Sequence, residues 1–154
     1  MKKALAWAMC IAWMAVIFAF SAMPGDVSGA QSGLITEVLM RLLSPLSDDG
    51  ISAPAATVEW IVRKGAHMTE YAVLFLLYHR ALRLSGAKRP GLFALALCAA
   101  YAATDELHQR FTPGRGPSPV DVMIDTAGAA LAALAHALFR AASRGKKAPR
   151  GVSP

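Results

Sequence analysis

The feature that most constrains the fold is a run of 19 residues without a charge, Ala4 to Ala22, near the start of the chain. At about 1.5 Å per residue, a helix of this length nearly spans the hydrocarbon layer of a membrane, which is about 30 Å thick. A cleaved signal sequence has a shorter apolar part, of about 7–15 residues. Phe20 also stands where a cleavage site after Ala22 needs a small residue. We therefore expect a retained first transmembrane helix.

Three further helices follow from the apolar pattern, at Pro54 to about Leu84, at Pro90 to about Gln109 and at Val120 to Phe139. Hydrophobic residues make up 55% of the chain, against about 45–50% in soluble domains. Cys10 and Cys98 fall inside apolar runs, where we expect them to act as small buried side chains. The sequence predicts an all-α polytopic membrane protein with four transmembrane helices.

The connection between the first and second helices, residues 26–53, mixes Ser, Gly, Pro and Asp. Within it, Leu34 to Leu43 places apolar residues at helical spacing opposite Glu37 and Arg41. This pattern predicts a short amphipathic helix. It fits a helix lying on the membrane surface and a packed loop helix equally well.

The distribution of Lys and Arg predicts the orientation, because cytoplasmic segments of membrane proteins carry more of these residues. With the N-terminus inside, the inner segments hold 11 cations and the outer segments hold 5. Both termini are therefore expected in the cytoplasm of a bacterial cell, with the chain as a multi-pass protein of the inner membrane. The net charge of +6 then reflects membrane anchors and not a nucleic-acid-binding surface.

We expect residues 1–140 to form one membrane domain, with a motif-bearing core at 60–139, and residues 141–154 to form a basic cytoplasmic tail.

Ionisable residues gather near the expected outer ends of the second, third and fourth helices. Isolated charges at such depth cost several kcal/mol, so they must pair or line a wet cavity. Arg63, Lys64, Arg110 and Arg115 are cations that could hold a phosphate there. The candidate site comprises His67, Glu70, Asp105, His108 and Asp121 as catalytic candidates, with Lys64, Glu106, Gln109, Arg115 and Asp125 as ligand-binding candidates.

Several motifs in this region resemble the VanZ-like family of small bacterial membrane proteins. The segment from Lys64 to Tyr71 resembles the family's K-x-x-H-x-x-E-Y pattern, and Asp105 to Arg115 resembles its D-E-x-H-Q-x-F-x-P-G-R block. Asp125 departs from the family, which usually has Asn there. The resemblance implies a role in the cell envelope, since the family's namesake is associated with reduced susceptibility to the glycopeptide antibiotic teicoplanin. It implies no known reaction.

Three functional hypotheses remain open from the sequence. The first is a site that binds or modifies the headgroup of a phospholipid or a lipid-linked envelope precursor, with membrane lipids as partners. The second is a metal-dependent hydrolase or transferase, although no cofactor is expected because the spacing of His and carboxylates matches no metal motif. The third is a structural or interaction protein whose charge cluster only holds the bundle together.

Overall fold

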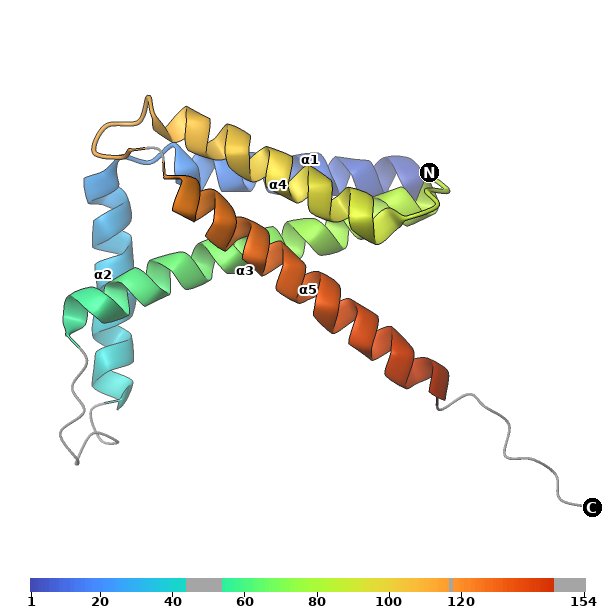
Figure 1. The fold of residues 1–154 in the computed structure, drawn as a ribbon. Coiled ribbons are helices and arrows are strands. Elements are labelled where there is room, and N and C mark those ends of the chain that lie inside the picture. Colours follow the sequence, from blue (N-terminus) through green and yellow to red (C-terminus); the bar gives the residue numbers. More distant parts are fainter. Residues whose placement is uncertain (44–53, 117, 146–154) are drawn as a thin grey trace, which may run out of the picture.

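The computed structural model describes residues 1–43, 54–116 and 118–145. Within these ranges the chain forms five helices and no strand (Figure 1). In chain order they are α1 (Lys2–Ser21), α2 (Gly25–Leu43), α3 (Ala55–Leu84), α4 (Pro90–Gln109) and α5 (Pro119–Gly145). The all-α prediction is confirmed.

The bounds of α1, α3 and α4 agree with the predicted helices to within two residues. Proline explains two of the starts: Pro54 directly precedes α3, and Pro90 is the first residue of α4, where its missing N–H costs no helical hydrogen bond. The helix α5 continues beyond the expected end at Phe139, across the predicted boundary at residue 140. Its last turns are rich in Ala and Arg, which favour helix. The rest of the predicted tail, 146–154, lies outside the described residues.

The helix α2 is longer than predicted, since it begins at Gly25 and not near Leu34. The prediction of its start was wrong because Gly25, Gly29 and Gly33 have low helix propensity. Tertiary packing overrides this propensity: α2 packs on α3, and its Ser32 and Thr36 are buried. Residues 44–53 of the same connection lie outside the described part of the chain.

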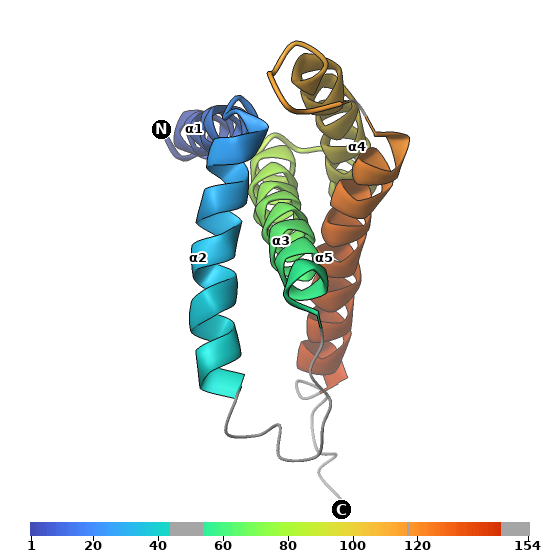
Figure 2. The ribbon, with the colours of Figure 1, turned by 90° about the vertical axis from the view of Figure 1, so that its left-hand side faces the viewer.

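The helix α3 is central, because it packs against each of the other four helices. Figure 1 shows that α1 and α4 run in one direction and α3 and α5 in the other, so that successive long helices alternate. Figure 1 also shows that α2 runs across the direction of these four helices, and Figure 2 shows it beside α3 at the near end of the bundle. The start of α5, the ends of α1 and α4, and the start of α2 therefore meet at one end of the bundle.

The core is built on one face of α3, where Tyr71, Leu74 and Phe75 are almost completely buried. Small residues of α4 pack against this face and bring the two backbones close together. Cys10 of α1 and Cys98 of α4 belong to the same cluster as free, buried side chains, which confirms the prediction for both cysteines.

Among the described residues, five side-chain hydrogen bonds connect α1 to other segments, and four of them lie in its second half. Trp13 donates its indole N–H to the Glu70 carbonyl oxygen at 2.9 Å, and Tyr101 donates its hydroxyl to the Met14 carbonyl oxygen at 2.7 Å. The Gln109 side-chain amide donates to the Ser21 hydroxyl at 3.0 Å. These bonds fix the position of α1 along α3 and α4.

Within the described residues, two helices are long and apolar enough to cross a membrane, α1 over Lys2–Ser21 and α5 over Pro119–Arg144. With 30 and 20 residues, α3 and α4 have the necessary length, but both carry ionisable residues within their apolar sequences. That the chain has four transmembrane helices therefore stays a prediction. It requires that the bundle shield the charges of α3 and α4 from lipid.

Candidate functional site

The candidate site lies at the end of the bundle where the connection between α4 and α5 meets the start of α2 (Figure 1). Gly25 donates its backbone N–H to the Pro113 carbonyl oxygen at 3.0 Å. A Cβ on Gly25 would collide with the carbonyl oxygen of Gly114, so this close approach requires glycine. Gly114 itself has φ +72°, a left-handed conformation that glycine adopts without strain. The turn places Arg115 directly after it, facing the bundle.

Residues of α3 and α5 face each other next to this turn. Lys64 Nζ forms an ion pair with Asp121 Oδ1 at 2.6 Å. His67 Nδ1 lies 3.8 Å from Glu70 Oε2 and 3.9 Å from Asp125 Oδ1. Both distances are too long for hydrogen bonds, and the buried Nδ1 has no partner among the described residues. The imidazole of His67 therefore stands between two carboxylates without being held by either.

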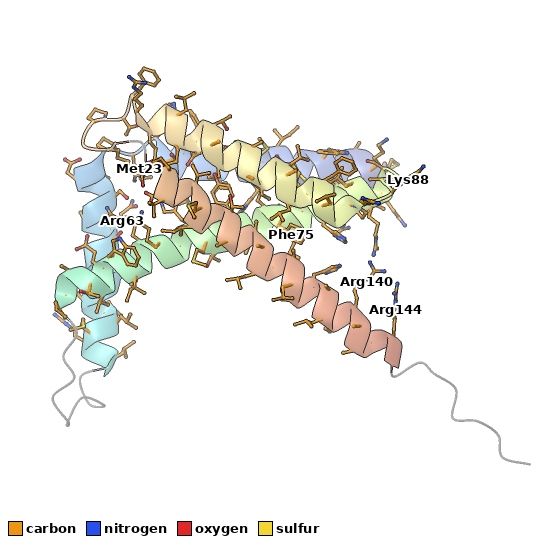
Figure 3. The ribbon with its side chains drawn as sticks, viewed as in Figure 1. Met23, Arg63, Phe75, Lys88, Arg140 and Arg144 are labelled. Carbon is orange, nitrogen blue, oxygen red and sulfur yellow. The ribbon has the colours of Figure 1, made fainter. Side chains whose placement is uncertain are left out.

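A pocket of about 210 Å³ opens between these elements, and we call it the polar pocket. It is lined by glycine backbone and polar side chains from α2, α3, α4, α5 and the connection before α5: Gly25, Arg63, Lys64, His67, Gln109, Gly114, Arg115, Gly116 and Asp121. Arg63 marks this end of the bundle in Figure 3. Three of the lining side chains are cations and one is a carboxylate.

Two of the three cations that line the polar pocket are arginines without an ion-pair partner among the described residues. Lys64 is paired with Asp121, but neither Arg63 nor Arg115 forms an ion pair within the part of the chain that the structure describes. The Nε atom of Arg63 is buried and has no hydrogen-bond partner there. Burial, and then the charge of Arg63, lowers the pKa of Arg115. Because a guanidinium is the most basic side-chain group in proteins, Arg115 remains protonated. The pocket therefore holds two guanidinium charges that an anion would stabilise.

Polar side chains near the end of α4 form hydrogen bonds that attach neighbouring segments to the site. Glu106 is buried, and its Oε2 accepts a hydrogen bond from the Ser118 backbone N–H at 2.8 Å. Gln109 donates to Ser21 of α1 and, more weakly at 3.5 Å, to Asp105 Oδ2. Asp105 is buried and its Oδ1 has no partner among the described residues. Glu106 thus attaches the connection before α5 to α4, and Gln109 attaches α1.

The structure brings most of the predicted site residues together. Those that line the polar pocket are Lys64, His67, Gln109, Arg115 and Asp121, and those that lie behind or beside it are Glu70, Asp105, Glu106 and Asp125. His108 lies apart, because its ring packs on Phe18 of α1 at a centroid distance of 4.5 Å and does not line the polar pocket. Its catalytic role stays a prediction without geometric support.

Arg63 was predicted only as a nearby cation that could hold a phosphate, and the backbone of three glycines was not predicted; all of these line the polar pocket. The signal for Arg63 is present in the sequence, because Arg63 and His67 are four residues apart and so share a helix face. No sequence pattern indicated that Gly25 lines the pocket, because Gly25 reaches it through contact with Gly114, which is far away in the chain.

The metal hypothesis rested on His67, His108 and the surrounding carboxylates. Across residues 1–43, 54–116 and 118–145, no group of three or more His, Cys, Asp or Glu side chains is arranged to hold a metal ion. That hypothesis also stays a prediction.

Comparison with known proteins identifies the family. No curated protein and no solved structure matches the chain. A family model described as VanZ/LLP1 matches residues 6–140, which include every helix residue that lines the polar pocket and the whole connection before α5. This match confirms the resemblance seen in the motifs of α3 and α4. The chain therefore belongs to the VanZ/LLP1 family.

Proposed function

We propose that this chain spans the bacterial inner membrane four times, with both termini in the cytoplasm. Family membership and the two apolar helices α1 and α5 indicate a membrane protein. The alternating directions of α1, α3, α4 and α5 support the four spans (Figure 1). Lys88, Arg140 and Arg144 lie at the end of the bundle opposite Arg63 (Figure 3), which supports a cytoplasmic position for that end. The polar pocket then faces the outer leaflet.

We infer that the polar pocket binds the phosphate-bearing headgroup of an envelope lipid. The observation that carries this inference is the pair of guanidinium groups, Arg63 and Arg115, that line one pocket without an ion-pair partner among the described residues. Two like charges in a partly buried site repel each other. A phosphate relieves this repulsion and accepts bidentate hydrogen bonds from guanidinium groups, which are stronger than neutral ones.

His67 is our candidate for proton exchange with the bound headgroup. It lines the polar pocket, and Glu70 and Asp125 lie within 4 Å of its Nδ1. Since neither carboxyl group hydrogen-bonds to the ring, Nδ1 has no partner among the described residues and can exchange a proton with a bound group. This arrangement supports a modifying as well as a binding role, and the binding role is the one that the arginines support directly.

The binding proposal is tested by removing one guanidinium. We expect Arg115→Ala to weaken binding of dihexanoyl phosphatidic acid by at least about tenfold, because a charged hydrogen bond contributes about 1.5–3 kcal/mol. The matched control is Arg110→Ala, which removes the same charge from an exposed residue at the end of α4 that does not line the pocket. Isothermal titration calorimetry on the purified proteins measures both. Equal affinities for the wild type and both variants would favour a cluster that only holds the bundle together.

We further propose that the site acts on the cell envelope and thereby alters susceptibility to glycopeptides such as teicoplanin. The support is family membership together with the outward position proposed for the pocket. A host that expresses the wild type should bind less glycopeptide at its surface than one that expresses Arg115→Ala at the same membrane level. Arg110→Ala should behave like the wild type. Identical glycopeptide binding in all three hosts would refute the envelope role.

A further inference from the structure

A second cavity, of about 220 Å³, adjoins the polar pocket. It lies between α2 and α3 at the end of α1, and its lining includes Phe20, Ile35, Val62 and Ala66. Most of its exposed wall is apolar, in contrast to the polar pocket, and we call it the apolar cavity. Phosphate binding in the polar pocket does not account for such a space.

The two cavities share three residues, because Arg63, His67 and Arg115 line both of them. The unpaired guanidinium groups therefore stand at the junction of a polar and an apolar compartment. A molecule with an anionic group next to an apolar chain matches this arrangement, with its charge at the junction and its chain in the apolar cavity. A water-soluble phosphate would use only one of the two compartments.

The apolar cavity also connects with the exposed face of α2. Ile35 lines the cavity and also belongs to an apolar groove on α2 formed with Leu34, Val38, Leu39 and Leu42. Leu34 and Leu42 of this groove are 68% and 69% exposed. Since α2 runs across the end of the bundle (Figure 1), its apolar face is suited to the boundary between lipid and water. Ile35 therefore joins the apolar groove on α2 to the apolar cavity.

We propose that the ligand of this site is a lipid phosphate whose hydrocarbon chain lies in the apolar cavity between α2 and α3 and reaches it along α2. This inference rests on the proposed function of the polar pocket and adds the binding site of the ligand's hydrocarbon chain. It assigns the apolar chain, and not the phosphate alone, a large part of the binding free energy, since each buried methylene contributes roughly a factor of four in affinity.

The test fills the apolar cavity without touching the arginines. Ala66 is an exposed residue of α3 that lines only the apolar cavity, so Ala66→Phe should occupy it without disturbing the core. Ala103→Phe, at an exposed position on α4 outside both cavities, adds the same ring elsewhere. Ile35→Ser, on exposed α2, is a second variant that removes part of the apolar wall.

Titration calorimetry with two probes, dihexanoyl phosphatidic acid and glycerol 3-phosphate, separates the chain from the phosphate. We expect Ala66→Phe to weaken phosphatidic acid binding about tenfold and Ile35→Ser about fivefold. Both variants should bind glycerol 3-phosphate with wild-type affinity. Ala103→Phe should bind both probes with wild-type affinity. If Ala66→Phe and Ile35→Ser bind phosphatidic acid as tightly as the wild type while Arg115→Ala does not, the chain does not occupy the cavity and only the phosphate site stands. If Arg115→Ala also binds both probes normally, the proposed function itself fails.

Discussion

Gly128 is the position where a single methyl group should most clearly disturb the bundle. It lies in α5 against the backbone of Met68 in α3. A Cβ on Gly128 would stand 2.7 Å from the Met68 Cα, 2.8 Å from its carbonyl carbon and closer still to its carbonyl oxygen. Ordinary contacts of a Cβ begin at 3.4 Å. Because these neighbours are backbone atoms that cannot rotate away, α5 must move outward by roughly 1 Å.

Two opposing effects determine how much Gly128→Ala changes the free energy of unfolding. Overpacking of a tightly packed contact costs about 1–3 kcal/mol, whereas replacing Gly by Ala within a helix gains about 1 kcal/mol of helix propensity. Gly65→Ala is the matched control, because Gly65 lies in α3 and a Cβ there would meet nothing within 4 Å. Both variants gain the same helix propensity, so the difference between their stabilities measures the cost of overpacking. We therefore expect Gly128→Ala to be less stable than Gly65→Ala by about 1–3 kcal/mol.

The assay is equilibrium unfolding of the purified proteins in mixed micelles, followed by circular dichroism. Gly65→Ala should unfold at the same or a higher denaturant fraction than the wild type, and Gly128→Ala at a lower one. A Gly128→Ala protein as stable as Gly65→Ala would refute the close approach of α5 to α3, and with it the contact that holds Asp121 and Asp125 next to Lys64 and His67.

Two further predictions concern the polar contacts of the site. The ion pairs Lys64–Asp121 and Arg41–Glu37 have the same length, 2.6 Å, but the side chains of the second are 77% and 62% exposed and those of the first 16% and 28%. Double-mutant cycles should therefore give a coupling free energy of about 1 kcal/mol or more for Lys64–Asp121 and at most about 0.5 kcal/mol for Arg41–Glu37; equal values would contradict the role of burial. Glu106→Ala should lower the free energy of unfolding by about 1–3 kcal/mol, since it leaves a backbone N–H without its acceptor, whereas Glu106→Gln keeps an acceptor. Equal stability of these two variants would argue against that bond.

Much of the helical framework could be predicted from the sequence, because its signals are local. Prolines at 54 and 90 mark the starts of α3 and α4, and the first apolar run accounts for α1. The spacing of Arg63, His67 and Glu70 places them on one face of a helix without knowledge of any partner. The start of α2 could not be predicted in this way, because its glycines form a helix only when packed against α3.

The candidate site could likewise be predicted only in those features that depend on local sequence. Asp105, His108 and Gln109 were all candidate site residues, but His108 and Gln109 are adjacent in sequence and so differ by about 100° around the helix. The rotation of α4 decides which of them enters the bundle, and packing against α1 turned Gln109 toward Ser21 and His108 toward Phe18. Arg115 likewise gained its position only through the contact of Gly114 with Gly25.

The sequence by itself determined where the long helices lie, at which end the cations gather and which ionisable residues share a helix surface. Each of these properties depends on residues within a few turns of one another. Only the tertiary structure decided that α2 crosses the end of the bundle, that Arg63 and Arg115 line one pocket without an ion pair among the described residues, and that an apolar cavity adjoins them. The physical reason is that helix rotation, crossing and close approach are set by contacts between distant segments, which periodicity and propensity do not encode.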